Sequence, residues 1–278
     1  MLDAINKRVS TRTFKNEVLT KEQITEIKGI VEKHKEIKGP FDHTVELTFN
    51  LSDPKELEGK KIGTYGVIKN MHAYIGGVSL EARSSLIDFG YVFERLILEL
   101  TDRDYDTCWL GGFFKRGNYR KGLQPNEVIP AISPIGFRAD KRSFLEKKIR
   151  KGAQSHKRIR FGDLFQYFDV EEELEDKADS KFVEIMHLIR KAPSASNKQP
   201  WRFYVSSNHE SVHVYLKRNE GYAASLGYDI QALDIGIALA HLEIGLDHYN
   251  LKFEKEVLKE DVFFDGLEYI ITYKKASS

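Results

Sequence analysis

The sequence has 278 residues but only one cysteine, Cys108, so it cannot form an internal disulfide bond. Proteins of oxidising compartments usually carry several cysteines, and we therefore expect a reducing, cytoplasmic location. Residues 1–12 lack the apolar core of a secretory signal. A helix that spans a bilayer needs about 20 apolar residues in a row, and the most apolar stretch, 232–246, contains two acidic residues and a histidine. We expect no association with membranes.

An excess of charge of one sign is also missing. Lys and Arg number 43 and Asp and Glu number 42, which gives a formal charge of +1. Such a balance argues against a protein dominated by nucleic-acid electrostatics or by an acidic tail. Hydrophobic residues at 41% and aromatic residues at 12% are too many for a disordered chain. The length fits one large domain or two of ordinary size.

Signature motifs of several enzyme classes are absent. The chain has no phosphate-binding loop ending in Gly-Lys-Ser/Thr, no dinucleotide-binding Gly-x-Gly-x-x-Gly and no Gly-x-Ser-x-Gly elbow. His209 and His213 do form a His-Glu-x-x-His pattern, which in zinc proteases lies on a helix. Here a Ser-Ser-Asn turn precedes it and alternating apolar residues at 212, 214 and 216 follow it, which predicts a hairpin. With one cysteine and no other suitable spacing, we expect no metal site.

Helix and strand patterns alternate along the chain and predict the α+β class. Thr20 and Gln23 predict a capping box at the start of the first helix. Pro130 and Pro134 restrict the strand that contains them to a sheet edge or a short piece. The first half has predicted helices at 20–36 and 84–101 and predicted strands at 43–51, 72–78 and 128–137. The second half has predicted helices at 180–191 and 229–246 and predicted strands at 201–205, 212–216 and 267–273.

The order helix, strand, strand, buried helix, strand therefore occurs twice. The two buried helices share an Asp-x-Gly pattern, at Asp88 and at Asp234, and the 146 positions between these aspartates are close to half the chain. The repeat predicts two similar halves, 1–165 and 166–278, that together form one compact unit. The alternative is a chance similarity, of a kind that any α+β protein can show.

Charge changes sign abruptly between the two halves. Residues 138–160 hold ten Lys and Arg residues, whereas residues 169–180 are mainly acidic. A solvated linker accounts for most of these charges. A few of the basic residues are expected to meet an anionic ligand.

The N-terminal segment Arg8-Val-Ser-Thr-Arg-Thr-Phe14 carries a first chemical signal. In an extended chain, side chains two residues apart point to the same side, so Arg8, Ser10 and Arg12 share one side. Two guanidinium groups and a hydroxyl there suit a phosphate group. The alternative is a charged arm without a ligand.

A second signal is the segment Ala192-Pro-Ser-Ala-Ser-Asn-Lys-Gln-Pro-Trp201, in which two prolines bracket a loop after a helix. Its polar side chains can read the edge of a polar heteroaromatic ring; they are Ser194, Ser196, Asn197 and Gln199. An ordinary polar turn before a strand is the alternative. A tryptophan directly after a proline is, however, unusual in a surface turn.

Together, these two segments resemble the hallmarks of the FMN-dependent nitroreductase family, an Arg-x-Ser-x-Arg/Lys-x-Phe arm and an Ala-Pro-Ser-x-x-Asn-x-Gln-Pro-Trp loop. A weaker similarity is the stretch from Cys108 to Phe113, where the family places backbone against the flavin ring. The basic run that includes Arg158 is similar to the family's late basic pair for the FMN phosphate.

The resemblance implies a nitroreductase-like α+β fold with antiparallel-rich sheets. Members of the family form intertwined homodimers that hold each FMN between an arm from one subunit and a loop from the other. Here the arm and the loop lie in different halves of one chain, so the resemblance implies a fused, tandem pseudo-dimer with one complete site, which can be a monomer.

The resemblance also implies which residues bind the cofactor. The first half would supply Arg8, Ser10, Arg12, Leu110, Gly111, Gly112 and Arg158, and the second half Pro193, Ser194, Ser196 and Asn197. No side-chain general acid is expected, and none is assigned as catalytic. Tyr65, Lys69, Phe113 and Phe114 are guesses for the substrate side, although a core or surface position is the more common outcome for such residues.

The implied activity is reduction of FMN by NADH or NADPH, followed by reduction of a small organic acceptor in the same pocket. One alternative is a flavin-binding or interaction protein without turnover. Another is an RNA-binding protein that uses residues 138–160, but it leaves the loop after Ala192 unexplained. We expect no nucleic-acid partner.

Overall fold

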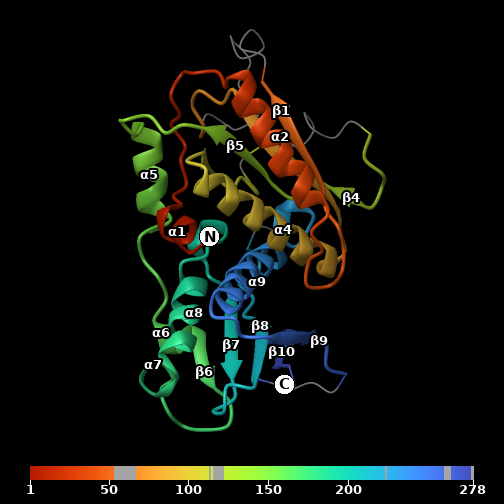
Figure 1. The fold of residues 1–278 in the computed structure, drawn as a ribbon, viewed down its shortest axis with the longest axis vertical. Helices are drawn as coiled ribbons and strands as arrows, with labels where there is room; N and C mark the ends of the chain where they lie inside the picture. The colour runs from red at the N-terminus through yellow and green to blue at the C-terminus, as the bar shows by residue number, and fades with distance from the viewer. Residues whose placement is uncertain (53–66, 113, 115–121, 223, 260–263, 277–278) are drawn as a thin grey trace.

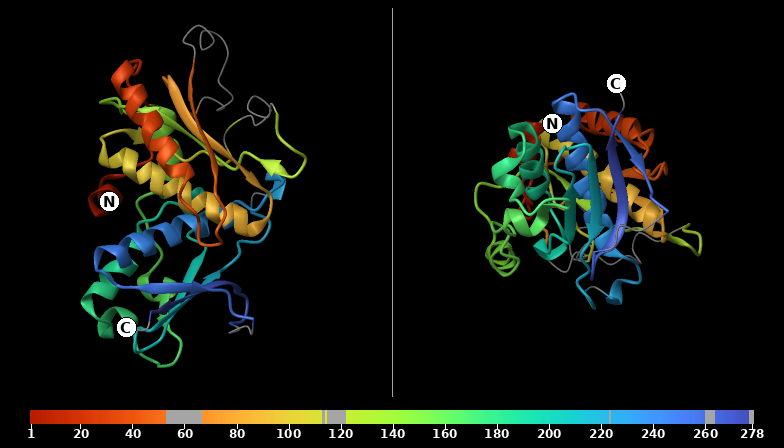
Figure 2. Two further views of the ribbon diagram at one scale, coloured as in Figure 1. Left: turned by 45° about the vertical axis from the view of Figure 1, so that its right-hand side comes forward. Right: turned by 90° about the horizontal axis from the view of Figure 1, so that it is seen from below.

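Two sheets lie at opposite ends of the long axis of the molecule, with helices between them. The computed structural model describes residues 1–52, 67–112, 114, 122–222, 224–259 and 264–276. In this part of the chain each sheet has five strands. Figure 1 and the left view of Figure 2 show the long helices α4 (Arg83–Asp102) and α9 (Ile230–His248) side by side in the middle.

The first sheet has the strand order β1-β2-β5-β3, with β4 paired to β2, and all its described pairs are antiparallel. Helix α2 packs against β1 and α4. Beside α4, the elements of this half are α1 (Leu2–Lys7), α2 (Lys21–Lys35), β1 (Glu46–Leu51), β2 (Ala73–Leu80), β3 (Asp106–Thr107), β4 (Glu127–Val128) and β5 (Ile132–Gly136).

The second sheet has the order β6-β7-β8-β10-β9, and only its described pair β6–β7 is parallel. Helix α8 packs against α9. The chain passes from the first sheet to the second through α5 (Phe144–Gly152) and α6 (Phe161–Leu164). The elements that follow are β6 (Phe165–Tyr167), α7 (Leu174–Lys177), α8 (Ser180–Arg190), β7 (Trp201–Val205), β8 (Ser211–Leu216), β9 (Phe253–Glu256) and β10 (Glu268–Lys275), with short 3-10 turns at Ala195–Asn197 and Ala224–Leu226.

The predicted α+β class with antiparallel-rich sheets is confirmed. The predicted helices and strands follow one another in the predicted order, and the structure adds further elements between them, such as β3 and β9. The predicted capping box is present, because the Thr20 side chain accepts from the backbone N–H of Gln23 and the Gln23 side chain accepts in return. The hairpin around His213 is also confirmed, since this residue lies in β8, which pairs with β7. The boundary between 165 and 166, which falls inside β6, stays a prediction.

One local prediction is confirmed in one of its two forms, and another needs correction. The strand predicted at 128–137 is made of two short pieces, β4 and β5, separated at Pro130, and β5 lies between β2 and β3 rather than at an edge. Pro134 is tolerated there because β3 pairs only with Ile135 and Gly136. The basic segment between the halves is not all linker, since it forms helix α5.

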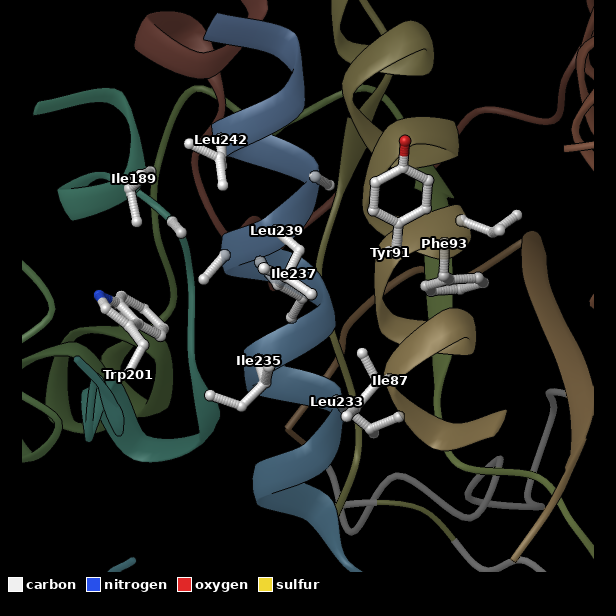
Figure 3. Packing of buried hydrophobic residues seen from close by; sticks show 14 of the residues in the cluster. Ile87, Tyr91, Phe93, Ile189, Trp201, Leu233, Ile235, Ile237, Leu239 and Leu242 are labelled. Carbon is white, nitrogen blue, oxygen red and sulfur yellow. The ribbon is translucent and has the colours of Figure 1, made fainter. Parts of the chain in front are cut away.

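The central contact of the fold is the crossing of α4 and α9 at two glycines. A Cβ atom on Gly236 of α9 would lie 1.9 Å from the carbonyl oxygen of Ile87, and one on Gly90 of α4 would lie 2.3 Å from that of Leu233. Ile87 and Leu233 are themselves 146 positions apart, so the contact is reciprocal between equivalent positions. Their side chains lie side by side between the helices (Figure 3).

Helix α9 is buried on nearly all sides and joins the two halves into one core. Trp201 of β7 and Ile189 of α8 lie on its far side from α4 (Figure 3), and both are fully buried. None of the helices in the described part of the chain is long and apolar enough to cross a membrane. Among these residues, no three His, Cys, Asp or Glu side chains come together as a metal site would require.

The crossing predicts a large effect of a single methyl group. Gly236→Ala should lower the free energy of unfolding by about 2 kcal/mol or more, as overpacked cores do, because neither helix backbone can move away. The matched control is Gly29→Ala in α2, where an added Cβ meets nothing within 4 Å and should raise stability by about 0.5–1 kcal/mol. Urea unfolding of both variants tests this, and equal midpoints for the two would contradict it.

Candidate functional site

A pocket of about 770 Å³ lies where the two halves meet. Six segments line it, and they come from both halves of the chain. They are the N-terminal arm, residues 109–112, the end of α5, the loop at 193–198, the segment 222–226 and the first turns of α9. Apolar side chains such as Ile149, Leu226 and Ile230 form much of the wall, with a few polar groups among them.

The N-terminal arm is extended, and β3 fixes it in place. Ser10 pairs with Thr107 in a parallel bridge, and the backbone N–H of Thr11 donates to the carbonyl of Thr107 at 2.9 Å. The buried Phe14 ends the arm in the core next to the first sheet. This arrangement puts Ser10 and Arg12 in the pocket wall, whereas Arg8 does not line the pocket.

Arg8 instead faces Glu94, a fully buried carboxylate on α4, with 3.8 Å between Nε and Oε1. Glu94 also accepts the indole N–H of Trp109 at 2.7 Å and lies 3.1 Å from Nε2 of His241 on α9. The other ring nitrogen of His241, Nδ1, lies 2.9 Å from the carbonyl oxygen of Leu188. One buried carboxylate thus connects the arm, the pocket wall and both central helices.

Three arginines from the predicted site have buried nitrogens that lack a partner. Within the described residues, no hydrogen-bond acceptor reaches Nη1 of Arg8, Nε of Arg12 or Nε of Arg158. Burial, with the neighbouring charges of Arg8 and Arg190, lowers the pKa of Arg158. Buried guanidinium donors normally have acceptors, because leaving them unpaired costs free energy. The arrangement therefore fits an anion with several acceptor oxygens.

The polar side chains of the loop after Ala192 mainly hold neighbouring segments. Asn197 donates to two backbone carbonyls of the segment before Arg158, at 2.9 and 3.1 Å, and its Oδ1 accepts from Arg158 at 3.4 Å. The buried side chain of Gln199 accepts the backbone N–H of Ile159 at 3.1 Å. Neither Asn197 nor Arg158 lines the pocket, and the contacts of Asn197 hold Arg158 in place behind the wall.

The other predicted residues of this loop do line the pocket, namely Pro193, Ser194 and Ser196. The hydroxyl of Ser194 accepts the backbone N–H of Gln199 at 2.9 Å, which closes the loop on itself. Ser196 has a left-handed φ of 48°, and its hydroxyl accepts from Tyr222 at 2.8 Å. The two serines are thus held in place before any ligand binds.

Leu110, Gly111 and Gly112 form another wall of the pocket. Leu110 is fixed by backbone hydrogen bonds to Ile132 in both directions, at 2.9 and 3.1 Å. A Cβ on Gly111 would lie 2.8 Å from Cδ1 of Ile230, so glycine allows this segment to approach α9 closely. Gly112 has more room, since the nearest atom to an added Cβ is 4.0 Å away.

Several pocket residues were missed by the sequence analysis. Tyr222 carries no local signal, because only the fold brings it to Ser196. Helix α5 did have a signal, since Ser143 caps it by accepting from the backbone N–H of Glu146, three residues later. Of the guesses for the substrate side, Tyr65 and Phe113 lie outside the described residues. Lys69 pairs with the arm through its backbone, and Phe114 is buried in a core cluster.

Asp234 is a further pocket residue that was noted only as part of the repeat. It lies in the second turn of α9, is 2% exposed, and its Oδ1 accepts the backbone N–H of Ala195 at 2.9 Å. Burial raises the pKa of Asp234 well above its ordinary value. The carboxyl therefore favours the protonated form much more than an exposed aspartate does.

The family model described as "Putative TM nitroreductase" matches residues 1–246 of the chain. No curated protein matches it in sequence.

Comparison with solved structures shows one that shares the fold over nearly the whole chain and others that are similar over about half of it. A putative nitroreductase from Thermotoga maritima MSB8 is 17% identical, with a TM-score of 0.62, over 99% of this chain and 93% of that chain. A nitroreductase family protein from Clostridium novyi NT is 20% identical over 50% of this chain and 84% of its own, with a TM-score of 0.40. An oxidoreductase containing FMN is 18% identical over 53% and 82%, with a TM-score of 0.43.

The raised pKa of Asp234 predicts a pH effect on stability. The folded state binds this proton more tightly than the unfolded chain, whose Asp pKa is about 3.9. Stability is therefore lost as the pH rises from that value through the folded pKa, by up to about 1.4 kcal/mol per pH unit. The variant Asp234→Asn has no carboxyl group at this position and does not lose stability in this way. The difference in free energy of unfolding between the variant and the parent should therefore shift in favour of the variant as the pH rises. Urea unfolding from pH 4 to 7 tests this, and a constant difference would contradict it.

Proposed function

The chain belongs to the Putative TM nitroreductase family, and we propose that it is an FMN-dependent oxidoreductase that uses NADH or NADPH to reduce a small organic acceptor. The family match and the fold shared with the Thermotoga maritima protein confirm the resemblance first drawn from the arm and the loop. The cofactor, the reductant and the acceptor are the proposed part.

One observation carries the choice of FMN. Arg8, Arg12 and Arg158 each have a buried nitrogen that no acceptor in the described part of the chain satisfies. A phosphate monoester supplies up to two negative charges and three strong acceptor oxygens. Of the three arginines, Arg12 lines the pocket of about 770 Å³, whose largely apolar wall suits a flat heteroaromatic ring. FMN combines both groups in one molecule.

The three arginines would not contribute equally. Arg12 lines the pocket, and Arg158 is held by Asn197 next to Arg8. Arg8 already faces the buried carboxylate of Glu94, so part of its charge is compensated within the protein. We therefore assign the main part of phosphate binding to Arg12 and Arg158, with Arg8 and the hydroxyl of Ser10 in support.

The flavin, when bound, supplies the hydride chemistry. The residues of this chain bind it, orient it and keep water from one side of it. The backbone at Gly111 and Gly112, fixed by its neighbours Leu110 and Ile230, offers a rigid surface for the ring. The indole of Trp109 adds to that wall, and its hydrogen bond to Glu94 fixes its orientation. We assign no side chain as general acid.

Both parts of the proposed site come from one chain. The arm belongs to the half proposed as 1–165 and the loop with Ser194 and Ser196 to the half proposed as 166–278. This arrangement supports the tandem pseudo-dimer, in which a monomer holds a complete site for cofactor and small acceptor.

Binding and turnover of flavin test the proposal directly. Purified protein incubated with FMN and then desalted should keep the visible absorbance of a flavin. It should also oxidise NADH or NADPH steadily when an artificial electron acceptor is added. A protein that stays colourless would contradict the proposal. A flavin-loaded protein without turnover would support the alternative of a binding protein.

A variant of Arg12 tests the phosphate assignment. Arg12→Ala should weaken FMN binding about tenfold or more, because charge-assisted hydrogen bonds to the phosphate are lost. Riboflavin, which lacks the phosphate, should bind the variant and the parent alike. Arg103→Ala is the matched control, since Arg103 pairs with Glu26 outside the pocket. Fluorescence titration with both flavins measures this, and an unchanged preference for FMN would remove Arg12 from the phosphate site.

A further inference from the structure

We propose that Asp234 binds the cofactor directly, by donating a hydrogen bond from Oδ2 to an oxygen of the flavin ring or of its ribityl chain. This inference rests on the proposed function, because it takes the occupant of the pocket to be FMN. It assigns a ligand-binding role to a residue of the central helix α9 rather than to the arm or the loop.

The first support is an unpaired atom in the pocket wall. Asp234 lines the pocket next to Ile230, Leu233 and Ile237 of the same helix. Its Oδ1 is used by the backbone N–H of Ala195, whereas Oδ2 is buried and finds no partner among the residues that the structure describes. A buried carboxyl oxygen without a partner costs about 1–3 kcal/mol. A ligand atom in the pocket would remove that cost.

The second support is an internal comparison with Asp88, the equivalent residue of α4. The loop after α2 covers Asp88, and both of its carboxyl oxygens are used. Oδ1 accepts the backbone N–H of Phe41 and Oδ2 that of His43, each at 2.9 Å. Gly39 of the same loop packs so closely that an added Cβ would lie 2.3 Å from the carboxyl group.

The equivalent aspartates of the two halves therefore have different hydrogen-bond partners. In the first half, two backbone N–H groups saturate the aspartate. In the second half, the loop at Ala195 provides one N–H to Oδ1, Oδ2 has no partner among the described residues, and Asp234 lies in the pocket wall. The unpaired Oδ2 is therefore the atom of this aspartate that a ligand in the pocket would contact.

The protonation of the Asp234 carboxyl group favours a role as a hydrogen-bond donor. Burial raises the pKa of Asp234 and favours the neutral acid. Since Oδ1 accepts from Ala195, the proton of the neutral acid lies on Oδ2. An O–H group there pairs with a carbonyl or hydroxyl oxygen, and the ring and ribityl chain of a flavin carry several of these.

Two substitutions of Asp234, to asparagine and to alanine, distinguish a hydrogen-bonding role from a packing role. Asp234→Asn keeps an acceptor for Ala195 and places an N–H donor at the Oδ2 position, so the affinity for FMN should stay within about threefold of the parent. Asp234→Ala removes the donor and should weaken FMN about tenfold, the effect of one lost buried hydrogen bond. The affinity for riboflavin should fall by the same factor as the affinity for FMN, because the contact does not involve the phosphate. If the alanine variant does not fold, Asp234→Leu replaces it, because leucine is similar in size to aspartate and has no donor.

Asp88→Ala is the matched control. It removes the equivalent carboxyl from the half where loop and helix are already paired, so it should lower stability but leave the affinity for flavin unchanged. Flavin affinity of Asp234→Ala equal to that of the parent would overturn the proposal, and so would equal losses in Asp234→Asn and Asp234→Ala. In both cases a parent that binds FMN would leave the proposed function intact. A parent that binds no flavin would overturn both.

Discussion

The close crossing of α4 and α9 is the constraint on which the rest of the structure depends. Gly90 and Gly236 let each backbone touch the other at a carbonyl, and no larger residue fits at either position. The sheets then lie on the outer sides of the helix pair, one at each end of the molecule (Figure 1). The pocket forms beside this contact, where the first turns of α9 meet the arm and residues 109–112.

Most of the fold could be predicted from sequence, because its elements carry local signals. Periodicity located the central helices within two residues of their ends, and Thr20 marked the start of α2. The arm and the loop after Ala192 were found because their residue order is specific. The relation between Arg8 and Glu94 could not be found in this way, since 86 positions separate them and only the fold brings them together. The same holds for Tyr222, whose partner Ser196 lies on another segment.

Some residues of the site line the pocket, and others only hold the lining residues or the arginines in position. Asn197 and Gln199 belong to the most recognisable motif of the chain, yet their side chains hold the segment at 154–159 and thereby Arg158. Glu94 does the same from the core, where it orients Trp109 and faces Arg8. A motif can therefore be specific because it fixes the geometry around a ligand, even where its side chains do not touch the ligand.

The reciprocal contact between α4 and α9 lies within a single polypeptide. An interface between separate subunits dissociates on dilution, whereas a contact inside one chain has a stability that does not depend on protein concentration. The two sides of the contact are also encoded separately, so a substitution at Asp88 leaves Asp234 unchanged, while in a symmetric dimer both copies change together. Covalent linkage thus keeps the pocket assembled at any dilution. It also allows equivalent positions in the two halves to hold different residues.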